Sequence, residues 1–96
     1  MAERAELTVV TYDMSDDKRR RRLVRVLESW GYRVQESVFE AWTTKEDRTK
    51  MKKQIRKCMD ETQDQLAMYV LAATDCADIN LIGTGALAPD DRNWIV

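Results

Sequence analysis

The chain has 96 residues, of which 44% are hydrophobic and 34% are charged, with three glycines and one proline. This length fits one domain, and the composition excludes disordered, collagen-like and low-complexity proteins, which have fewer apolar residues or far more glycine and proline. Histidine is absent, which excludes imidazole-based catalytic triads, histidine-ligated zinc and histidine pH switches. Any acid-base chemistry must therefore use carboxylates, and a core this small makes oligomerisation plausible.

Cysteine content and hydropathy exclude further classes of protein. Cys58 and Cys76 lack the spacing of a redox pair and are too few for a zinc cage, so we interpret them as small buried apolar residues. Residues 1–6 are polar, and the longest apolar run, residues 66–73, is too short to cross a bilayer. We therefore expect no signal peptide, no membrane partner and a cytoplasmic location.

The formal net charge of -1 conceals a strong asymmetry along the chain. Residues 18–57 hold 14 of the 16 basic residues and five acidic ones, a balance of +9, and the remainder balances at -10. Charged helix faces are often only solvated surface, but four consecutive arginines exceed what solubility requires, and the planar fork of arginine matches phosphate oxygens. Nucleic acid is therefore the leading candidate partner. The two basic clusters are Lys18, Arg19, Arg20, Arg21, Arg22 and Arg25, and then Lys45, Arg48, Lys50, Lys52, Lys53, Arg56 and Lys57.

The first elements are a strand and a helix. Residues 7–12 (LTVVTY) are β-branched and aromatic, which predicts a strand that ends at Asp13. A helix is expected over residues 16–30, with Ser15 as its cap and Gly31 as its stop, because its apolar residues recur at helical spacing. These apolar residues are Leu23, Val26, Leu27 and Trp30; Arg21, Arg22 and Arg25 lie away from them, and Arg19 and Arg20 lie nearer, at the Asp13 end.

The second half of the chain predicts strands on either side of a second helix. Residues 33–42 alternate imperfectly, which predicts two short strands or one strand bent by a bulge. Thr43 and Glu46 match a capping box for a helix that runs to about residue 62, with a strongly basic outer face. The apolar run 66–73 is interpreted as a buried central strand.

A last short strand is expected over residues 79–82. The order of elements predicts an α+β protein with the ferredoxin-like β-α-β-β-α-β fold and an extra C-terminal strand. We assign residues 1–85 to this domain. The tail, residues 86–96, contains Pro89, an acidic pair and an apolar ending at residues 94–96, which suggests docking on a neighbouring subunit.

This fold hosts unrelated functions, so the function must be argued from a site. An RNA-recognition module would carry a basic-glycine-aromatic signature where this chain has SVFEAW, and a small-molecule regulatory domain would have a glycine-rich turn where it has YDMSDD. Both signatures are therefore missing. The feature that points to chemistry is Asp13, which puts a carboxylate near the arginines that could bind phosphate. A symmetric dimer would bring two such carboxylates around one magnesium ion, which could activate water for phosphodiester attack. The alternative is a strand-end aspartate hydrogen-bonded to nearby backbone.

Residues 12–42 resemble the signature of the CRISPR-associated protein two family, the small subunit of the spacer-acquisition complex. Members of this family have a hydrophobic strand ending in Tyr-Asp, an arginine-bearing helix ending near glycine, and a Gln-x-Ser-Val-Phe segment. The quadruple arginine is denser than the family pattern, and the tail from Ala86 matches no family motif. The matching residues are Tyr12, Asp13, Arg20, Arg22, Gly31, Gln35, Ser37, Val38 and Phe39.

The resemblance implies a homodimer in which the two Asp13 residues face one another as the metal ligands, and as the catalytic residues if the protein is active, with Mg²⁺ or alternatively Mn²⁺ as the cofactor. It implies a subunit that bridges dimers of the larger CRISPR integrase subunit and holds a prespacer of double-stranded DNA. A magnesium-dependent endonuclease acting on single-stranded RNA or duplex DNA is the alternative, and an unrelated nuclease or a structural protein of similar fold is a third class. The residues expected to surround the site are Tyr12, Ser37 and Phe39, and those expected to bind nucleic acid are Arg19, Arg20, Arg21, Arg22, Arg25, Arg33, Lys50 and Lys53.

Overall fold

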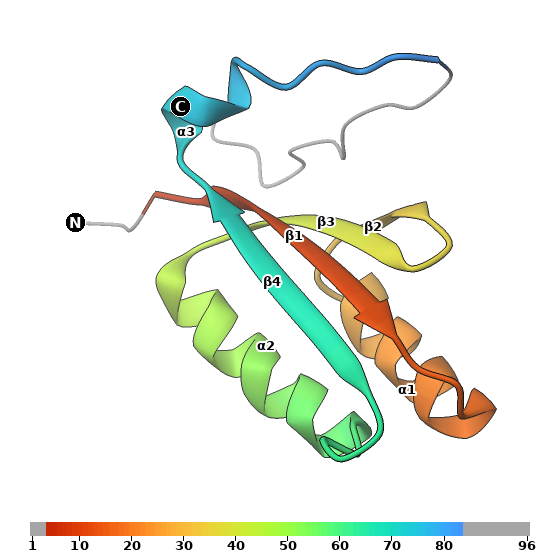
Figure 1. Ribbon diagram of the computed structural model, residues 1–96. Helices are drawn as coiled ribbons and strands as arrows, with labels where there is room; N and C mark the ends of the chain where they lie inside the picture. The colour runs from red at the N-terminus through yellow and green to blue at the C-terminus, as the bar shows by residue number, and fades with distance from the viewer. Residues whose placement is uncertain (1–3, 84–96) are drawn as a thin grey trace.

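The computed structural model describes residues 4–83 and confirms the predicted α+β order (Figure 1). Four strands form one antiparallel sheet in the order β2-β3-β1-β4, so β1 and β3 are central. This is the ferredoxin-like arrangement that the sequence predicts. The elements are β1 (Glu6–Asp13), α1 (Asp17–Glu28), β2 (Tyr32–Gln35), β3 (Val38–Thr43), α2 (Lys45–Cys58), β4 (Gln65–Leu71) and the short α3 (Ala73–Cys76).

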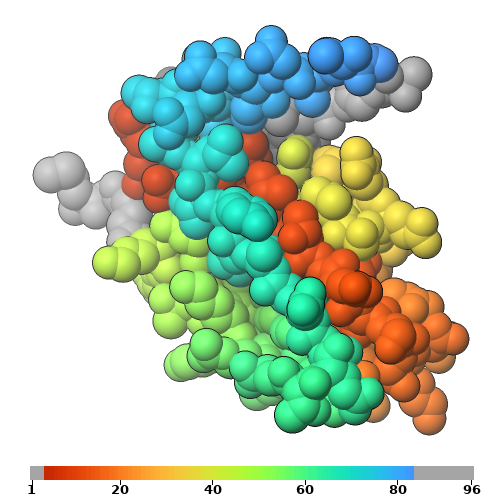
Figure 2. Space-filling view, in the orientation of Figure 1, coloured from red at the N-terminus to blue at the C-terminus, as the bar shows by residue number. Residues whose placement is uncertain are grey.

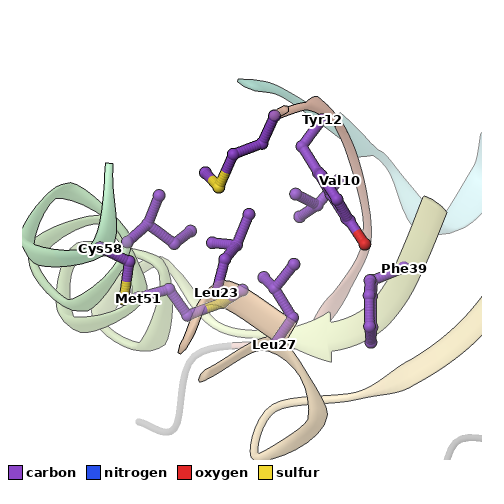
Figure 3. Close-up of a cluster of buried hydrophobic side chains, with 9 residues drawn as sticks. Val10, Tyr12, Leu23, Leu27, Phe39, Met51 and Cys58 are labelled. Atoms are coloured by element: carbon purple, nitrogen blue, oxygen red, sulfur yellow. The ribbon is translucent and has the colours of Figure 1, made fainter. Parts of the chain in front are cut away.

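The core lies between the sheet and the two long helices, which cover one face of the sheet (Figure 3). Alternate residues of β1 point into it, because side chains on a strand alternate between the two faces. Val10 and Tyr12 meet Phe39 of β3, and both helices bring their apolar residues onto this layer. The buried cluster consists of Val10, Tyr12, Met14, Leu23, Leu27, Phe39, Met51, Ile55 and Cys58.

The opposite face of the sheet is covered only in part within the described residues. α3 contacts β1 and β4, and the chain up to Gly83 lies across the end where β1 begins (Figure 1). Figure 2 shows β1 and β4 running side by side across the face in view. Tyr69 of β4 is 59% exposed and Ile82 is 94% exposed. Large apolar side chains are therefore exposed to solvent on β4 and in the segment that follows α3.

Two helix caps differ from the expectation. The cap of α1 is Asp16 rather than Ser15, and its carboxylate accepts a hydrogen bond from the backbone N–H of Arg19 at 2.9 Å. The capping box of α2 is one residue later than predicted, with Thr44 as the cap and Asp47 as its partner. Thr43 instead ends β3, where its buried hydroxyl is 2.7 Å from the hydroxyl of Thr8.

The end of α2 and the strands that follow also differ from expectation. α2 ends at Cys58 rather than near residue 62, because Asp60 offers the backbone a different partner by accepting hydrogen bonds from the N–H and the hydroxyl of Thr62. Among the described strands β4 lies at the edge of the sheet rather than in its centre, because it pairs with β1 alone. Of the two alternatives for residues 33–42, the structure shows two short strands, β2 and β3, which pair with a register shift between Arg33 and Gln35.

Residues 79–83 form no strand in this chain, so the extra strand predicted over residues 79–82 is wrong for the structure described. Most of the short α3 and its following turn are exposed. The tail 86–96 lies outside the described residues, and its docking on a neighbouring subunit stays a prediction.

Gly31, in the turn between α1 and β2, allows the backbone to pass close to β3, and its replacement tests this packing. A Cβ at this position would lie 2.2 Å from the backbone oxygen of Glu40 and 2.6 Å from the Cβ of Ala41. Gly31→Ala should therefore lower the free energy of unfolding by about 3 kcal/mol, since a central strand cannot move aside cheaply. Urea denaturation measures the loss. Glu28→Ala, an exposed change in the same region, should cost less than about 0.5 kcal/mol, and equal losses for the two variants would contradict the packing argument.

Candidate functional site

Asp13 is the last residue of β1, beside Gln65 of β4 in the sheet register. Its side chain is exposed, since it follows the final buried position of the strand. Within residues 4–83 its carboxylate makes no hydrogen bond or ion pair, so the structure does not support a strand-end aspartate tied to nearby backbone. The carboxylate is available to a ligand.

Two cavities meet at Tyr12 and Asp13, one on each side of the end of β1. The first, which we call the arginine cavity, has a volume of about 490 Å³. The second, the β4-side cavity, has a volume of about 540 Å³ and includes two further acidic residues, Glu61 and Asp64. Asp13 therefore separates a cavity with two arginines from one whose charged groups are all acidic. The arginine cavity is lined by Tyr12, Asp13, Met14, Arg20, Arg33, Glu36 and Ser37.

Arg33, which lies on β2, is held in place by neutral groups. Its Nε donates to the backbone oxygen of Glu36 at 3.0 Å, and its Nη2 donates to the hydroxyl of Tyr12 at 3.3 Å. The guanidinium carbon lies 5.7 Å from the centre of the Phe39 ring, within the range of a cation-π contact. Tyr12 in turn donates to the backbone oxygen of Glu36 at 3.0 Å. The turn between β2 and β3 and the end of β1 thus fix this side chain.

Arg20, in the first turns of α1, reaches the same cavity from the other side. Its Nη1 donates to the backbone oxygen of Met14 at 3.2 Å, and its Nη2 pairs with Asp17. The backbone N–H of Tyr12 donates to the backbone oxygen of Ser37 at 3.2 Å, which draws the β2–β3 turn to the end of β1. Two arginines distant in the sequence therefore line one cavity beside Asp13.

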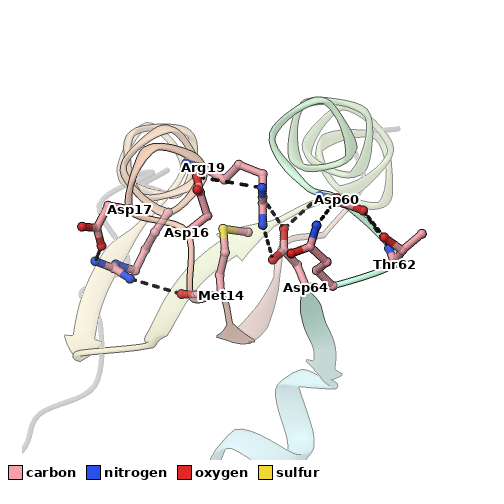
Figure 4. A network of polar contacts seen from close by, with 9 residues as sticks. Met14, Asp16, Asp17, Arg19, Asp60, Thr62 and Asp64 are labelled. Atoms are coloured by element: carbon pink, nitrogen blue, oxygen red, sulfur yellow. Dashed lines mark hydrogen bonds and ion pairs between the residues drawn. The ribbon is translucent and has the colours of Figure 1, made fainter.

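Arg19 has a different environment from the other arginines of α1 (Figure 4). Its Nε and Nη2 donate to the two carboxylate oxygens of Asp64 at 2.8 and 3.1 Å, and Asp64 also accepts from the backbone N–H of Asp60 at 2.8 Å. The Asp64 side chain is fully buried. This bidentate pair joins α1 to the loop between α2 and β4, so Arg19 holds the wall of the β4-side cavity instead of facing solvent.

The electrostatics of this pair follow from its hydrogen bonds. The Arg19 guanidinium, which donates to Asp64, holds the pKa of that carboxyl below its usual range, and the bond from the Asp60 backbone adds to the effect. The Asp64 carboxylate raises the pKa of Arg19 by the same hydrogen bond. Hydrogen bonds from Thr62 and Gln63 lower the pKa of Asp60.

The outer faces of α1 and α2 form a continuous basic surface, because the two helices lie side by side on the sheet. The indole N–H of Trp30, just after α1, donates to the side-chain oxygen of Gln54 on α2 at 2.8 Å and fixes their spacing. Arg48 is not part of this surface, since it contacts Glu6 and Thr43. The exposed residues expected to bind nucleic acid are Arg21, Arg22 and Arg25 on α1, Arg33 on β2, and Lys50 and Lys53 on α2.

The structure brings together five of the residues singled out from the sequence, and leaves others apart. Those at the arginine cavity are Tyr12, Asp13, Arg20, Arg33 and Ser37, with Phe39 buried beneath Arg33. The lysines of α2 lie on the helix surface outside this cavity. The acidic loop that lines the β4-side cavity was missed by sequence reasoning, although the run DETQD at residues 60–64 could have indicated it.

The metal-binding capacity of one chain is small. Within residues 4–83, no three histidine, cysteine, aspartate or glutamate side chains gather in a way that could hold a metal ion. Asp13 supplies one free carboxylate, and magnesium is commonly held by one or two carboxylates with water and substrate phosphate. The donor set fits such an ion only if a second copy of the chain or a bound phosphate completes it.

Comparison with known proteins identifies the family. Residues 6–79 match the family described as CRISPR associated protein Cas2. The chain belongs to this family. It is also 33% identical over 90 residues to the CRISPR-associated endoribonuclease Cas2 3 of Synechocystis sp. PCC 6803, an alignment that covers 94% of this chain and 98% of that protein.

Solved structures agree with membership of the Cas2 family. The hypothetical protein TT1823 from Thermus thermophilus superposes with a TM-score of 0.77 at 34% identity and covers 88% of this chain and 99% of that one. A chain of a partial Cas6-RT-Cas1–Cas2 complex superposes with a TM-score of 0.69 at 26% identity, covering 80% of this chain and 84% of that one. Among the helices of residues 4–83, none is long and apolar enough to cross a membrane.

The Arg19–Asp64 pair predicts a specific acid response. Because folding lowers the pKa of Asp64, the pair contributes stability above the unfolded-state pKa, near 3.9, and that contribution is lost as the pH falls through the lower folded-state value. Asp64→Asn should therefore lower the free energy of unfolding at pH 7 and flatten its fall below about pH 4. Urea denaturation across this pH range measures the slope.

Glu61→Gln provides the matched control for this measurement, since it changes an exposed carboxylate of the same loop. Its acid slope should stay close to that of the unmodified chain. An Asp64→Asn slope as steep as that of the unmodified chain would contradict the proposed source of acid sensitivity.

Proposed function

We propose that this protein is a homodimeric subunit of CRISPR adaptation that holds a prespacer of duplex DNA on its basic helices and bridges dimers of the integrase. Membership of the Cas2 family supports the adaptation role. The observation that carries the binding role is the basic surface of α1 and α2, where Arg21, Arg22 and Arg25 are exposed and make no ion pair within the described residues. Their charge is free to neutralise phosphates.

Binding through this surface would be independent of base sequence. The side chains are long, flexible and carried on the outside of helices, and the partners they suit are phosphate oxygens rather than base edges. The groove lined by Arg20, Arg21, Arg25 and Arg33 continues this surface towards Asp13. A phosphate backbone that follows α1 would therefore be led to the arginine cavity.

The open face of the sheet supports the homodimer. Tyr69 of β4, which lies beside Val9 on this face, is 59% exposed, and Leu81 and Ile82 beyond α3 are 52% and 94% exposed. Exposed apolar groups gathered on one side of a small domain are typical of a subunit interface. β4 is also an edge strand, whose outer backbone groups can pair with another chain.

An integrase partner is supported by the chain of similar fold found in a Cas1–Cas2 complex. The arrangement suits a bridging subunit, because a two-fold dimer presents each surface twice and can bind one partner at each end.

The second candidate function is a magnesium- or manganese-dependent endonuclease acting on single-stranded RNA or duplex DNA. The free carboxylate of Asp13 favours it, as does the word endoribonuclease in the name of the Synechocystis relative. Asp13 from each of two copies would hold the ion, which when bound supplies charge neutralisation and an activated water. Arg20 and Arg33 would orient the phosphate beside it.

The binding proposal is tested by replacing Arg21, Arg22 and Arg25 together with alanine. Each phosphate contact adds about 0.9 to the slope of log affinity against log salt, so the triple variant should bind duplex DNA more weakly and with a slope reduced by about 2 to 3. Fluorescence anisotropy at several salt concentrations measures both. Arg4→Ala, at the far end of β1 from Asp13, is the control; an unchanged slope in the triple variant would rule out this surface.

The two candidate functions are separated by Asp13→Ala in spacer integration in vitro, with the integrase subunit, prespacer duplex and magnesium present. If the protein is a bridge, Asp13→Ala should integrate at near the unmodified rate, whereas the triple arginine variant should fail. Binding without divalent ions should be equal or tighter in Asp13→Ala, since a repulsive carboxylate is removed. Loss of integration by a folded, dimeric Asp13→Ala protein would show that metal chemistry belongs to the function.

A further inference from the structure

Two ion pairs join a helix to the sheet, one at each end of β1. At the start of the strand, Arg48 of α2 donates to Glu6, with 3.0 Å between Nη2 and Oε1. At the other end, Arg19 of α1 pairs with Asp64, the residue immediately before β4, whose side chain is fully buried. The second pair therefore lies at the end of β1 that carries Asp13, and the first lies at the opposite end.

The sheet register connects the Arg19–Asp64 pair to Asp13. The pairing of β1 with β3 stops at Thr11, whereas its pairing with β4 continues to Asp13, which lies opposite Gln65. Among the described strands, β4 alone is therefore paired with Asp13. Gln65 directly follows Asp64 in the chain, so the place of the Asp64 side chain sets where β4 begins and where it meets the end of β1.

The Asp64 carboxylate is held by donors from two directions (Figure 4). Arg19 donates to both of its oxygens, at 2.8 and 3.1 Å, and the backbone N–H of Asp60 donates to one of them at 2.8 Å. A bidentate pair fixes orientation as well as distance. Arg19 is fixed in turn, because its backbone N–H donates to the capping carboxylate of Asp16, which closely follows Asp13. The pair thus ties the chain that leaves Asp13 to the strand that lies beside it.

The side chain of Asp13 has no such support of its own. It is exposed, and within the described residues its carboxylate makes no hydrogen bond or ion pair. Its position therefore depends on the backbone at the end of β1. A metal ligand must be placed within about 0.5 Å of its productive geometry, and loss of the groups that orient a ligand commonly weakens metal binding by about 10- to 100-fold.

We propose that the Arg19–Asp64 pair positions the Asp13 carboxylate for a divalent ion held between two copies of the chain. This inference rests on the second candidate function and identifies the positioning residues that it requires. Neither member of the pair needs to contact the ion, because the effect passes through the backbone of β4 and of the connection between β1 and α1. In a two-fold dimer a displacement of Asp13 occurs in both copies, so the geometry around the ion is disturbed twice.

The test uses Arg19→Lys and Asp64→Glu, which keep both charges and lose the bidentate geometry. Mn²⁺ is titrated into the full chain, and its binding is followed by EPR. Each variant should raise the Kd for Mn²⁺ by about 3- to 10-fold, a smaller effect than that of losing a group bonded directly to the ligand. The double variant should bind no more weakly than the weaker single variant, because the two residues act as one unit.

A second readout follows Asp13 without any metal. In NMR spectra of the metal-free protein, the backbone amide signal of Asp13 should shift in Arg19→Lys, because the end of β1 moves relative to β4. Added Mn²⁺ should broaden this signal in the unmodified chain, which locates the ion. Asp13→Asn should abolish the binding that causes the broadening.

Arg48→Lys and Glu6→Asp are the matched controls, since they also keep both charges and disturb the ion pair at the opposite end of β1. They should lower the free energy of unfolding measured in urea, but leave the Kd for Mn²⁺ and the Asp13 amide signal unchanged. Light scattering checks that every variant is as dimeric as the unmodified chain.

Two results would overturn the inference while the second candidate function stands. In the first, the unmodified chain binds Mn²⁺ at Asp13, but Arg19→Lys and Asp64→Glu change neither the Kd nor the amide signal. In the second, Arg48→Lys weakens Mn²⁺ binding as much as Arg19→Lys does, so that the loss follows from stability alone. Absence of Mn²⁺ binding at Asp13 in the unmodified chain would instead overturn the second candidate function and, with it, the positioning role.

Discussion

The double pairing of β1 is the constraint on which the rest of the molecule depends. This strand bonds to β3 along one edge and to β4 along the other, so its residues cannot shift register without disrupting the whole sheet. Its alternation sends Val10 and Tyr12 into the core and leaves Asp13 exposed at the end. Both cavities open at that end, because the β2–β3 turn on one side and the α2–β4 loop on the other both meet the end of β1 there.

Opposite charges are kept apart by this arrangement. The arginines of α1 approach Asp13 from one side, and the acidic loop after α2 approaches from the other. Arg19 crosses between them and is neutralised by a buried carboxylate, since an unpaired charge there would be costly. Arg20 pairs with Asp17, whereas Arg21, Arg22 and Arg25 keep their charge for solvent or a ligand. One run of four arginines therefore contains both a structural ion pair and a phosphate-binding surface.

The helix geometry explains this division of roles. Consecutive residues on a helix point about 100° apart, so four adjacent arginines cannot share one direction. Arg19 faces the α2–β4 loop, Arg20 faces the end of β1, and Arg21 and Arg22 face solvent. A count of charges along the sequence treats the four arginines as equivalent, whereas their different surroundings give them different roles.

Periodicity and local charge act over a few residues, so the sequence predicted the order of the main elements, the core stripe of α1, the basic faces of both helices and the place of Asp13 at the end of the first strand. Competing local hydrogen bonds decided that Thr44 rather than Thr43 caps α2 and that α2 ends at Cys58. The sequence pattern does not indicate which of these hydrogen bonds is stronger. The position of β4 at the edge of the sheet was decided by the pairing of the strands in the folded protein. The meeting of Tyr12, Arg20 and Arg33 around one cavity, and the capture of Arg19 by Asp64, were decided by the tertiary structure alone, because these contacts join residues that only the folded sheet and its turns bring within reach.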